Sequence, residues 1–181
     1  GGVESILRQS VLTDEQKQQM LEVTQQLSAQ GYRVLAVAKS AKSYDKFPAT
    51  QAEFDYTFLG LIAFSDPPKK NTASIITSFY QAGIGVKMIT GDYAPTAIAI
   101  AKQIGIQNHQ AVLTGDEIML MDAVTIQEKV KATNVYARMF PEAKLKVIEA
   151  FNRNGEVVAM TGDSVNDGPA LKAAHIGIAM G

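Results

Sequence analysis

The sequence contains no cysteine and no tryptophan, and only two histidines, His109 and His175, occur among its 181 residues. The absence of cysteine excludes disulfide bonds, thiolate nucleophiles and zinc sites with cysteine ligands. No apolar run reaches the roughly 18 to 20 residues of a membrane-spanning helix, and no charged-then-apolar leader opens the chain. We therefore expect a soluble chain, and we interpret the two isolated histidines as structural.

The chain also lacks an excess of charge, because 17 Lys and Arg residues stand against 18 Asp and Glu residues. A net charge of −1 gives no reason to expect a nucleic acid or an anionic membrane surface as a partner. A hydrophobic content of 46% is typical of a globular protein. Because the sequence opens without methionine and closes directly after an apolar run, we expect a folded piece of a longer protein.

From Thr57 onward, short apolar runs alternate with helical segments, which is the pattern of a parallel sheet with crossover helices. The predicted strands are 57–64, 85–89, 134–137, 156–160 and 176–179. The predicted helices are 71–81, 95–104, 125–131, 141–152 and 165–174. Before this pattern we expect a helix that Thr13 and Gln16 cap, then a buried strand over 32–38 and a loop over 39–51. The pattern predicts an α/β fold.

The tripeptide Thr-Gly-Asp occurs three times, at 90–92, 114–116 and 161–163. The first and third copies follow predicted strands and precede helices, so they are expected at the carboxyl ends of strands, where open α/β sheets bind ligands. A threonine hydroxyl and free amides beside a helix N-terminus suit a phosphate oxygen. The middle copy is interpreted as an ordinary turn with a helix cap.

Asp163 and Asp167 lie four positions apart around a predicted strand-to-helix turn, and Asn166 stands between them. Both carboxylates can point at one spot, and Mg²⁺ prefers one or two carboxylates together with substrate phosphate oxygens and water. The spacing also fits two aspartates that merely cap the helix beginning near Val165. The residues alone leave both interpretations open.

Two cationic side chains are also candidates for binding phosphate. Lys144 stands in the first turn of the helix opened by Pro141, and Arg138 ends the strand before it. A lysine so placed can hold a phosphoryl group as a point charge, although a solvated surface lysine has the same spacing. Arg33 begins an apolar strand, where it either reaches an anionic ligand or is an ordinary edge arginine.

No nucleophile stands out. Asp66 follows a predicted strand, but Pro67 and Pro68 come next and carry no amide hydrogens to hold a phosphate. No segment matches a phosphate-binding Walker loop, a serine nucleophile elbow or a zinc-protease helix.

Taken together, these segments resemble the cytoplasmic catalytic part of P-type cation-transporting ATPases, members of the haloacid dehalogenase-like group. The matching stretches are DPPK (66–69), KMITGD (87–92), ARMFPEAK (137–144) and TGDSVNDGPAL (161–171). Residues 1–7 (GGVESIL) also look like the family's K-G-A-x-E segment entered just after its lysine.

The resemblance implies two domains. Residues 1–56 would be the C-terminal part of a nucleotide-binding domain. Residues 57–181 would be a Rossmann-like phosphorylation domain without the strand that carries the phosphorylated aspartate, and Asp66-Pro67-Pro68 would be the hinge. The family's D-K-T-G-T motif, its adenine-site aromatic and lysine, its actuator domain and its transmembrane helices are all absent from the sequence.

The resemblance also assigns site residues. The catalytic set would be Thr90, Lys144, Asp163, Asn166 and Asp167, with Asp163 and Asp167 binding Mg²⁺. The set that binds ATP would be Arg33, Thr90, Gly91, Asp92, Arg138 and Lys144. Ser164, Gly168 and His175 stand where the family more often has Gly, Ala and Asp.

The implied parent couples ATP hydrolysis, through an aspartyl phosphate, to cation transport across a membrane, which we expect to be the cell membrane. The chain itself would be an inactive cytoplasmic piece whose partners are ATP, Mg²⁺ and the remaining pump domains. The transported cation, for which we favour calcium, would bind elsewhere. Alternatives are a soluble Mg²⁺-dependent phosphatase of the same fold and a non-enzymatic nucleotide-binding module. Because the missing strand is central in such folds, we expect an open sheet whose edges are covered by self-association.

Overall fold

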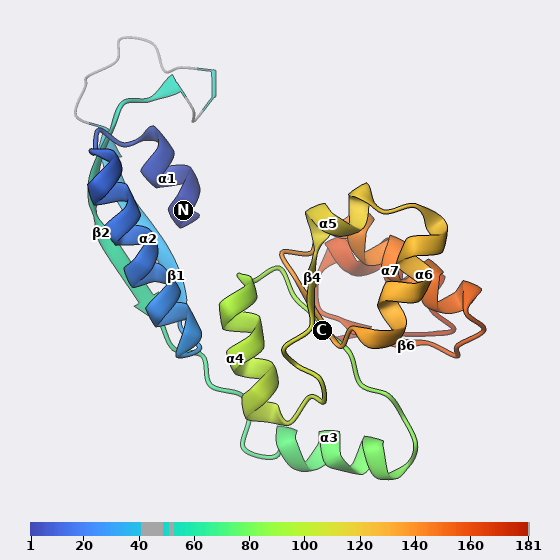
Figure 1. The fold of residues 1–181 in the computed structure, drawn as a ribbon. Coiled ribbons are helices and arrows are strands. Elements are labelled where there is room, and N and C mark those ends of the chain that lie inside the picture. The colour runs from blue at the N-terminus through green and yellow to red at the C-terminus, as the bar shows by residue number, and fades with distance from the viewer. Residues whose placement is uncertain (41–48, 51–52, 181) are drawn as a thin grey trace. The chain divides into compact units, whose positions relative to one another are not determined.

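The computed structural model describes residues 1–40, 49–50 and 53–180, and it divides into two compact units, Gly1–Pro67 and Pro68–Gly181 (Figure 1). The division falls within Asp66-Pro67-Pro68, the segment expected to be a hinge. Each unit has a hydrophobic core of its own. The sequence-based boundary at residue 56 therefore lies eleven residues before the point at which the structure divides (67 − 56).

The first unit packs two helices, α1 (Val3–Gln9) and α2 (Asp14–Ala29), on one face of a two-stranded sheet. The predicted cap is present, since the Thr13 hydroxyl accepts from the Gln16 amide and the Gln16 side chain accepts from the Thr13 amide. The core of this unit is built from α1 and the inward-facing strand residues, with Val3, Leu7 and Ala36 buried.

The two strands of this unit are β1 (Arg33–Ser40) and β2 (Tyr56–Phe64), which pair antiparallel with Leu35 opposite Ile62. The sequence analysis placed 57–64 in the parallel sheet of the second domain, and that placement was wrong. Apolar alternation identifies a strand but not its partner, and here Phe58 and Leu61 join the α1–α2 core. The predicted loop over 39–51 starts too early, since Lys39 and Ser40 belong to β1; residues 41–48 and 51 lie outside the described residues.

The second unit has the predicted parallel α/β architecture. Strands β3 (Met88–Ile89), β5 (Val135–Ala137) and β4 (Val112–Thr114) form a parallel sheet in the order β3-β5-β4. Strands β6 (Ala159–Gly162) and β7 (Ile176–Ala179) form a second parallel sheet. β4 was not predicted, although β5, which is equally short, was. β3 is shorter than predicted. β6 begins and ends later than predicted, so Thr161 and Gly162 lie inside a strand.

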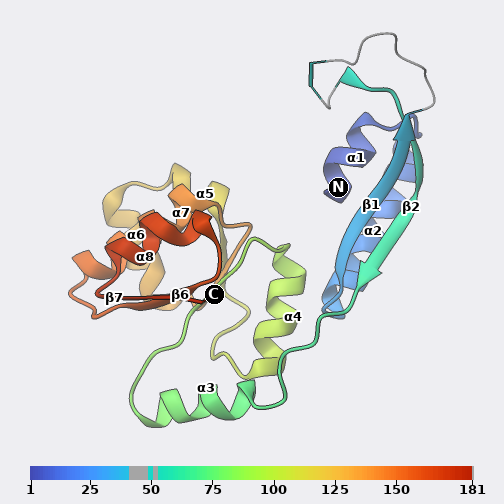
Figure 2. The ribbon, with the colours of Figure 1, turned by 180° about the vertical axis from the view of Figure 1, so that it is seen from behind.

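Helices cover both faces of the three-stranded sheet (Figures 1 and 2). Tyr136 of β5 points into the core formed with α5 (Gly115–Leu120), α6 (Ala123–Ala132) and α7 (Pro141–Arg153). Its neighbours Val135 and Ala137 point to the opposite core, formed with α3 (Thr72–Gln81) and α4 (Ala94–Ile104). The alternation follows from the two-residue period of a strand.

The smaller sheet is covered by α7 and by α8 (Gly168–Ala173), through Ile148, Met160 and Ala170. A 3₁₀ turn, Val165–Asp167, precedes α8, so the helix predicted over 165–174 is split in two. The turn arises because Ser164 caps it and Pro169 restarts the helix at its first positions.

The parallel strands do not form one continuous sheet. Among the described residues, β3 pairs only with β5 and β6 pairs only with β7, so each keeps one edge without a strand partner. Ile89 of β3 packs against the core shared with α7 and also against the core under β6. The two sheets are thus neighbours that share no strand pair among the described residues.

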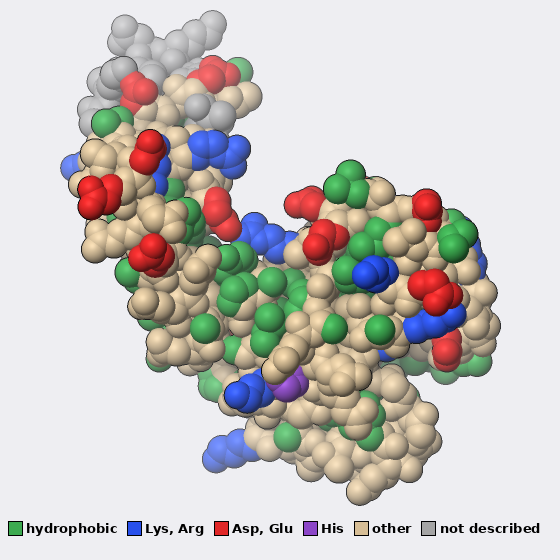
Figure 3. Space-filling view, viewed as in Figure 1, with side chains coloured by type: hydrophobic (Ala, Val, Ile, Leu, Met, Phe, Trp, Pro, Cys, Tyr) green, Lys and Arg blue, Asp and Glu red, His purple; other side chains and the backbone are tan. Residues whose placement is uncertain are grey.

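Within the described residues, no helix combines the length and the apolar composition that crossing a membrane requires. On the face of the second unit visible in Figure 3, acidic and basic side chains are interspersed rather than gathered by sign.

Candidate active site

A largely buried ion pair in the second unit joins Lys144 and Asp167, which lie 23 residues apart. The Lys144 Nζ donates to Asp167 Oδ1 at 2.6 Å, and only 16% and 6% of the two side chains are exposed. The Lys144 hydrogen bond, opposed in part by burial, holds the pKa of Asp167 below its ordinary value. Lys144 lies in the first turn of α7, so the helix that follows β5 reaches the turn that follows β6.

The turn after β6 is shaped so that the Asp167 carboxylate faces inward. The Ser164 hydroxyl accepts from the Asn166 amide, while Asp167 Oδ2 accepts from the Ser164 amide at 3.3 Å. A Cβ atom on Gly162 would lie 2.7 Å from the Asp167 side chain, so glycine is the residue that leaves room for this carboxylate. The capping interpretation is thus correct for Asp167, and the same residue also contacts Lys144.

Thr90 and Asp92 form a second local structure, at the carboxyl end of β3. The Thr90 hydroxyl donates to Asp92 Oδ2 and accepts from the Asp92 amide, both at 3.1 Å. Tyr93 then caps α4, with Pro95 in the first turn. Thr90 is half-buried and Gly91 is exposed, so the loop presents backbone at the edge of the sheet.

Arg138 joins the loop after β5 to the loop after β3. Its amide donates to the Asp92 carbonyl at 2.9 Å, and the next amide, of Met139, donates to the Thr90 carbonyl at 3.0 Å. Arg138 adopts a left-handed backbone with φ of 51°, which is uncommon for a non-glycine residue. Its guanidinium carbon lies 5.0 Å from the centre of the Tyr93 ring.

The middle Thr-Gly-Asp copy is the helix cap that the sequence analysis expected. The Thr114 hydroxyl accepts from the Glu117 amide, and the Glu117 carboxylate accepts from the Thr114 amide, at the start of α5. Gly115 is required there, because a Cβ atom would lie 2.6 Å from the Arg138 carbonyl oxygen. This copy supports the neighbouring loop and is not itself placed as a ligand site.

Asp163 and Asn166 are exposed, and among the described residues neither side chain has a hydrogen-bond partner. The part of the chain that the structure describes contains no group of three or more His, Cys, Asp or Glu residues close enough to hold a metal. This donor set still fits Mg²⁺, which commonly takes one or two carboxylates and fills its other positions with water and phosphate oxygens. Of the two predicted Mg²⁺ ligands, Asp163 is exposed and Asp167 is buried.

The remaining predicted site residue, Arg33, belongs to the other unit. It opens β1, is exposed, and lies opposite Phe64 of β2. Asp66 is exposed beside its two prolines and joins no cluster of side chains among the described residues. A hollow of about 360 Å³ lies at the amino ends of β3 and β5, lined in part by Tyr80, Gly85 and Asn134, and no predicted site residue lines it.

Two residues of this site were missed by the sequence analysis. Ser164 was noted only as a departure from the resemblance, although a serine three positions before an acidic residue is a capping signal. Tyr93 carried no signal, because its contact with Arg138 depends on two loops brought together by the sheet.

Comparison with known proteins decides the family. A model of the haloacid dehalogenase-like hydrolases matches residues 9–175. The chain belongs to this family. The chain is 43% identical to the probable cation-transporting ATPase F of Mycobacterium bovis over 169 residues, which cover 90% of the chain and 19% of that protein.

Two further relatives are calcium-transporting ATPases. Identity to calcium-transporting ATPase 1 of Saccharomyces cerevisiae is 41% over 174 residues, covering 94% of the chain and 18% of the relative. Identity to calcium-transporting ATPase 1 of Bacillus cereus is 38% over 172 residues, covering 94% and 19%. The resemblance to P-type cation-transporting ATPases is confirmed, and this haloacid dehalogenase-like chain spans about a fifth of the length of the relatives it matches.

Proposed function

We propose that the chain is the part of an ATP-driven P-type cation pump that holds Mg²⁺ and the phosphoryl group. The observation that carries this proposal is the buried contact between Lys144 and Asp167, which fixes an ammonium group at the carboxyl ends of the strands. A cation held there is suited to a phosphoryl group, because phosphoryl transfer is catalysed mainly by positioning and by charge stabilisation. Homology to the cytoplasmic region of P-type ATPases supports the same assignment.

Different residues of the site would bind the phosphoryl group and Mg²⁺. Lys144, oriented by Asp167, would offset the charge of the phosphoryl oxygens. The Thr90 hydroxyl would exchange its hydrogen bond to Asp92 for one to a phosphoryl oxygen. Asp163, with Asn166 beside it, would hold Mg²⁺, which when bound supplies further positive charge to the phosphate oxygens.

The nucleotide would be held by residues outside this pair of carboxylates. Gly91 and Asp92 stand at the edge of the sheet beside Arg138. Arg33 would serve nucleotide binding as part of the first unit, the proposed nucleotide-binding domain. The proposed domain roles follow the division seen in the structure: the unit Gly1–Pro67, which includes β2, would belong to the nucleotide-binding domain, and the unit Pro68–Gly181 to the phosphorylation domain.

The proposal leaves the acceptor aspartate to the rest of the pump. Asp66 is a poor nucleophile because Pro67 and Pro68 supply no amide hydrogens. The pump's remaining domains would supply the acceptor and the transmembrane helices, so that this chain is the cytoplasmic part of an integral protein of the cell membrane. The chain would not bind the transported cation, and the names of two relatives favour calcium.

The test is a comparison of binding and turnover. We expect ATP to bind to the chain in a Mg²⁺-dependent manner, with no hydrolysis of ATP or of p-nitrophenyl phosphate. Asp163→Ala should remove the Mg²⁺ dependence, whereas Asp116→Ala, at the exposed aspartate of the middle copy, should not. Mg²⁺-dependent hydrolysis that Asp163→Ala abolishes would instead establish a soluble phosphatase. ATP binding that ignores both Mg²⁺ and Asp163→Ala would establish a non-enzymatic binding module.

A further inference from the structure

Arg138 is held in an unusual conformation at the edge of the sheet. Its φ of 51° places it in the left-handed region, where the backbone of a non-glycine residue is strained. The strain is maintained by two hydrogen bonds to the β3 loop, from the Arg138 amide to Asp92 and from the Met139 amide to Thr90. Gly115 packs under the Arg138 carbonyl with no room for a Cβ atom. A backbone fixed on three sides sets the direction in which the arginine side chain leaves the sheet.

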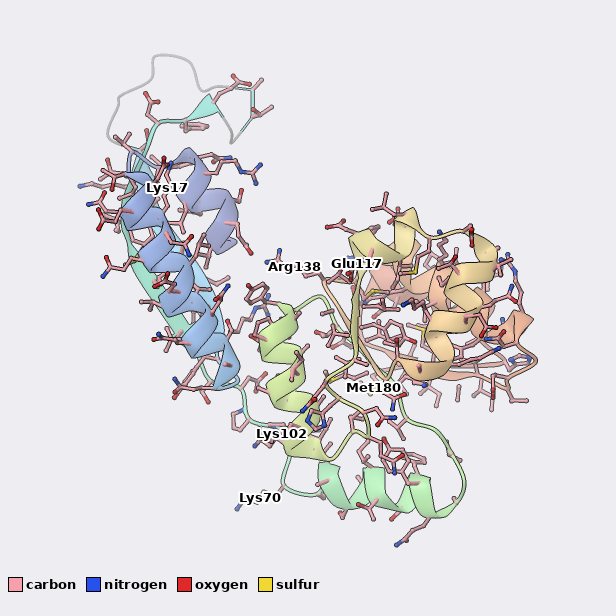
Figure 4. The ribbon with its side chains drawn as sticks, in the orientation of Figure 1. Lys17, Lys70, Lys102, Glu117, Arg138 and Met180 are labelled. Atoms are coloured by element: carbon pink, nitrogen blue, oxygen red, sulfur yellow. The ribbon has the colours of Figure 1, made fainter. Side chains whose placement is uncertain are left out.

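The Arg138 side chain leaves the sheet over an aromatic ring. Its guanidinium carbon lies 5.0 Å from the centroid of Tyr93, within the range of a cation–π contact. Figure 4 labels Arg138 beside the amino-terminal end of α4, the helix that Tyr93 caps. Tyr93 is half-buried whereas Arg138 is exposed, so the ring is the more fixed of the two partners.

We propose that Tyr93 is a positioning residue, whose ring holds the Arg138 guanidinium for the phosphate groups of a nucleotide at the carboxyl ends of β3 and β5. A guanidinium stacked on an aromatic face keeps its N–H groups at its edge, where they can donate to phosphate oxygens. An arginine without such a platform must lose side-chain freedom when the ligand binds, which weakens binding. The inference rests on the proposed function, since it names Tyr93 as a determinant of nucleotide affinity at that site.

The experiment is a double-mutant cycle on ATP binding. Binding is measured by NMR titration of the full chain with ATP in the presence of Mg²⁺. Tyr93→Leu should weaken ATP binding by about three- to fivefold, the range expected for one exposed cation–π contact. Tyr93→Phe, which keeps the ring and removes the hydroxyl, should bind as the wild type does. In an Arg138→Gln background, Tyr93→Leu should have no further effect, because the ring acts through the guanidinium.

An equal loss from Tyr93→Leu in both backgrounds would overturn the inference, since the ring would then act without Arg138. A second readout does not depend on the ligand: the Arg138 side-chain protons should show an upfield ring-current shift that Tyr93→Leu abolishes and Tyr93→Phe retains. Absence of that shift would also overturn the inference. Failure of the wild type to bind ATP would contradict the proposed function, and with it the ligand named here, while the ring-current shift would still decide whether Tyr93 holds Arg138.

Discussion

Asp163 and Asp167 look equivalent in sequence, but their surroundings in the structure are opposite. Asp167 is buried at 4% exposure and pairs with Lys144, whereas Asp163 is exposed. The buried carboxylate orients the lysine and the exposed one is open to an ion. From these separate environments we predict a separate role for each aspartate, so the two can be tested against each other.

Replacing either aspartate by asparagine should therefore have different effects. Asp167→Asn leaves the Lys144 ammonium without its ion partner and should lower the free energy of unfolding of the second unit by about 3 kcal/mol. Asp163→Asn should change it by less than about 0.5 kcal/mol. Urea denaturation followed through the NMR signals of α7 measures both, and equal destabilisation by the two changes would contradict the division of roles.

A glycine pair provides a second test at the scale of single residues. A Cβ atom at Gly115 would lie 2.6 Å from the Arg138 carbonyl oxygen and 2.8 Å from the Phe140 ring, whereas nothing lies within 4 Å of one at Gly168. Gly115→Ala should destabilise the second unit by about 1 to 3 kcal/mol through overpacking. Gly168→Ala, in the first turn of α8, should be neutral or stabilising by up to about 1 kcal/mol. Thermal unfolding of both variants compares them, and a harmless Gly115→Ala would show that the two loops are not packed as described.

At the scale of elements, the short helix α5 depends on its cap. Hydrogen bonds from the Thr114 side chain and amide hold the pKa of Glu117 below its ordinary value. A depressed folded-state pKa means that the cap stabilises the protein above the unfolded-state pKa, near 4.3 for glutamate. This stabilisation is lost as the pH falls through the lower, folded-state value.

Acidification should therefore loosen α5 before it affects helices without such a cap. Hydrogen exchange of the α5 amides should accelerate, after correction for the intrinsic rate, as the pH is lowered below the ordinary glutamate pKa of about 4.3. Glu117→Gln, which can still cap but does not titrate, should remove that dependence. The same acid response in both proteins would show that another group is responsible.

The elements also show which parts of the fold could be predicted. Caps are local, so Thr13 and Pro141 predicted the starts of α2 and α7 correctly. The partner of β2 could not be predicted, because apolar alternation describes the faces of a strand and not its neighbour. The contact between Lys144 and Asp167 could not be predicted either, because the two residues are 23 positions apart and only the fold brings them together. The sequence showed them as two separate motifs.

At the scale of the whole molecule, the main feature is that the parallel strands form two separate sheets. Among the described residues, β3 and β6 each keep one edge without a strand partner, and Ile176 and Ile178 of β7 are 54% and 47% exposed. Unpaired strand edges are templates for pairing with another chain. Self-association of the isolated chain thus stays a prediction, and the structure names the edges of β3 and β6 as the places where a second copy could pair.

Light scattering over a range of concentrations tests this prediction. The average mass should rise above that of the 19.5 kDa chain as the concentration increases. A strictly monomeric mass at high concentration would show that the edges are protected without a second copy.

The central claim is that this chain is the part of a P-type pump that binds Mg²⁺ and the phosphoryl group, with the acceptor aspartate supplied from elsewhere in the same protein. The most direct measurement is to sequence the native gene on both sides of the region that encodes residues 1–181. The account predicts a D-K-T-G-T motif upstream and hydrophobic spans on both sides. A start codon directly before Gly1 and a stop codon directly after Gly181 would contradict it and would leave an independent binding module as the better account.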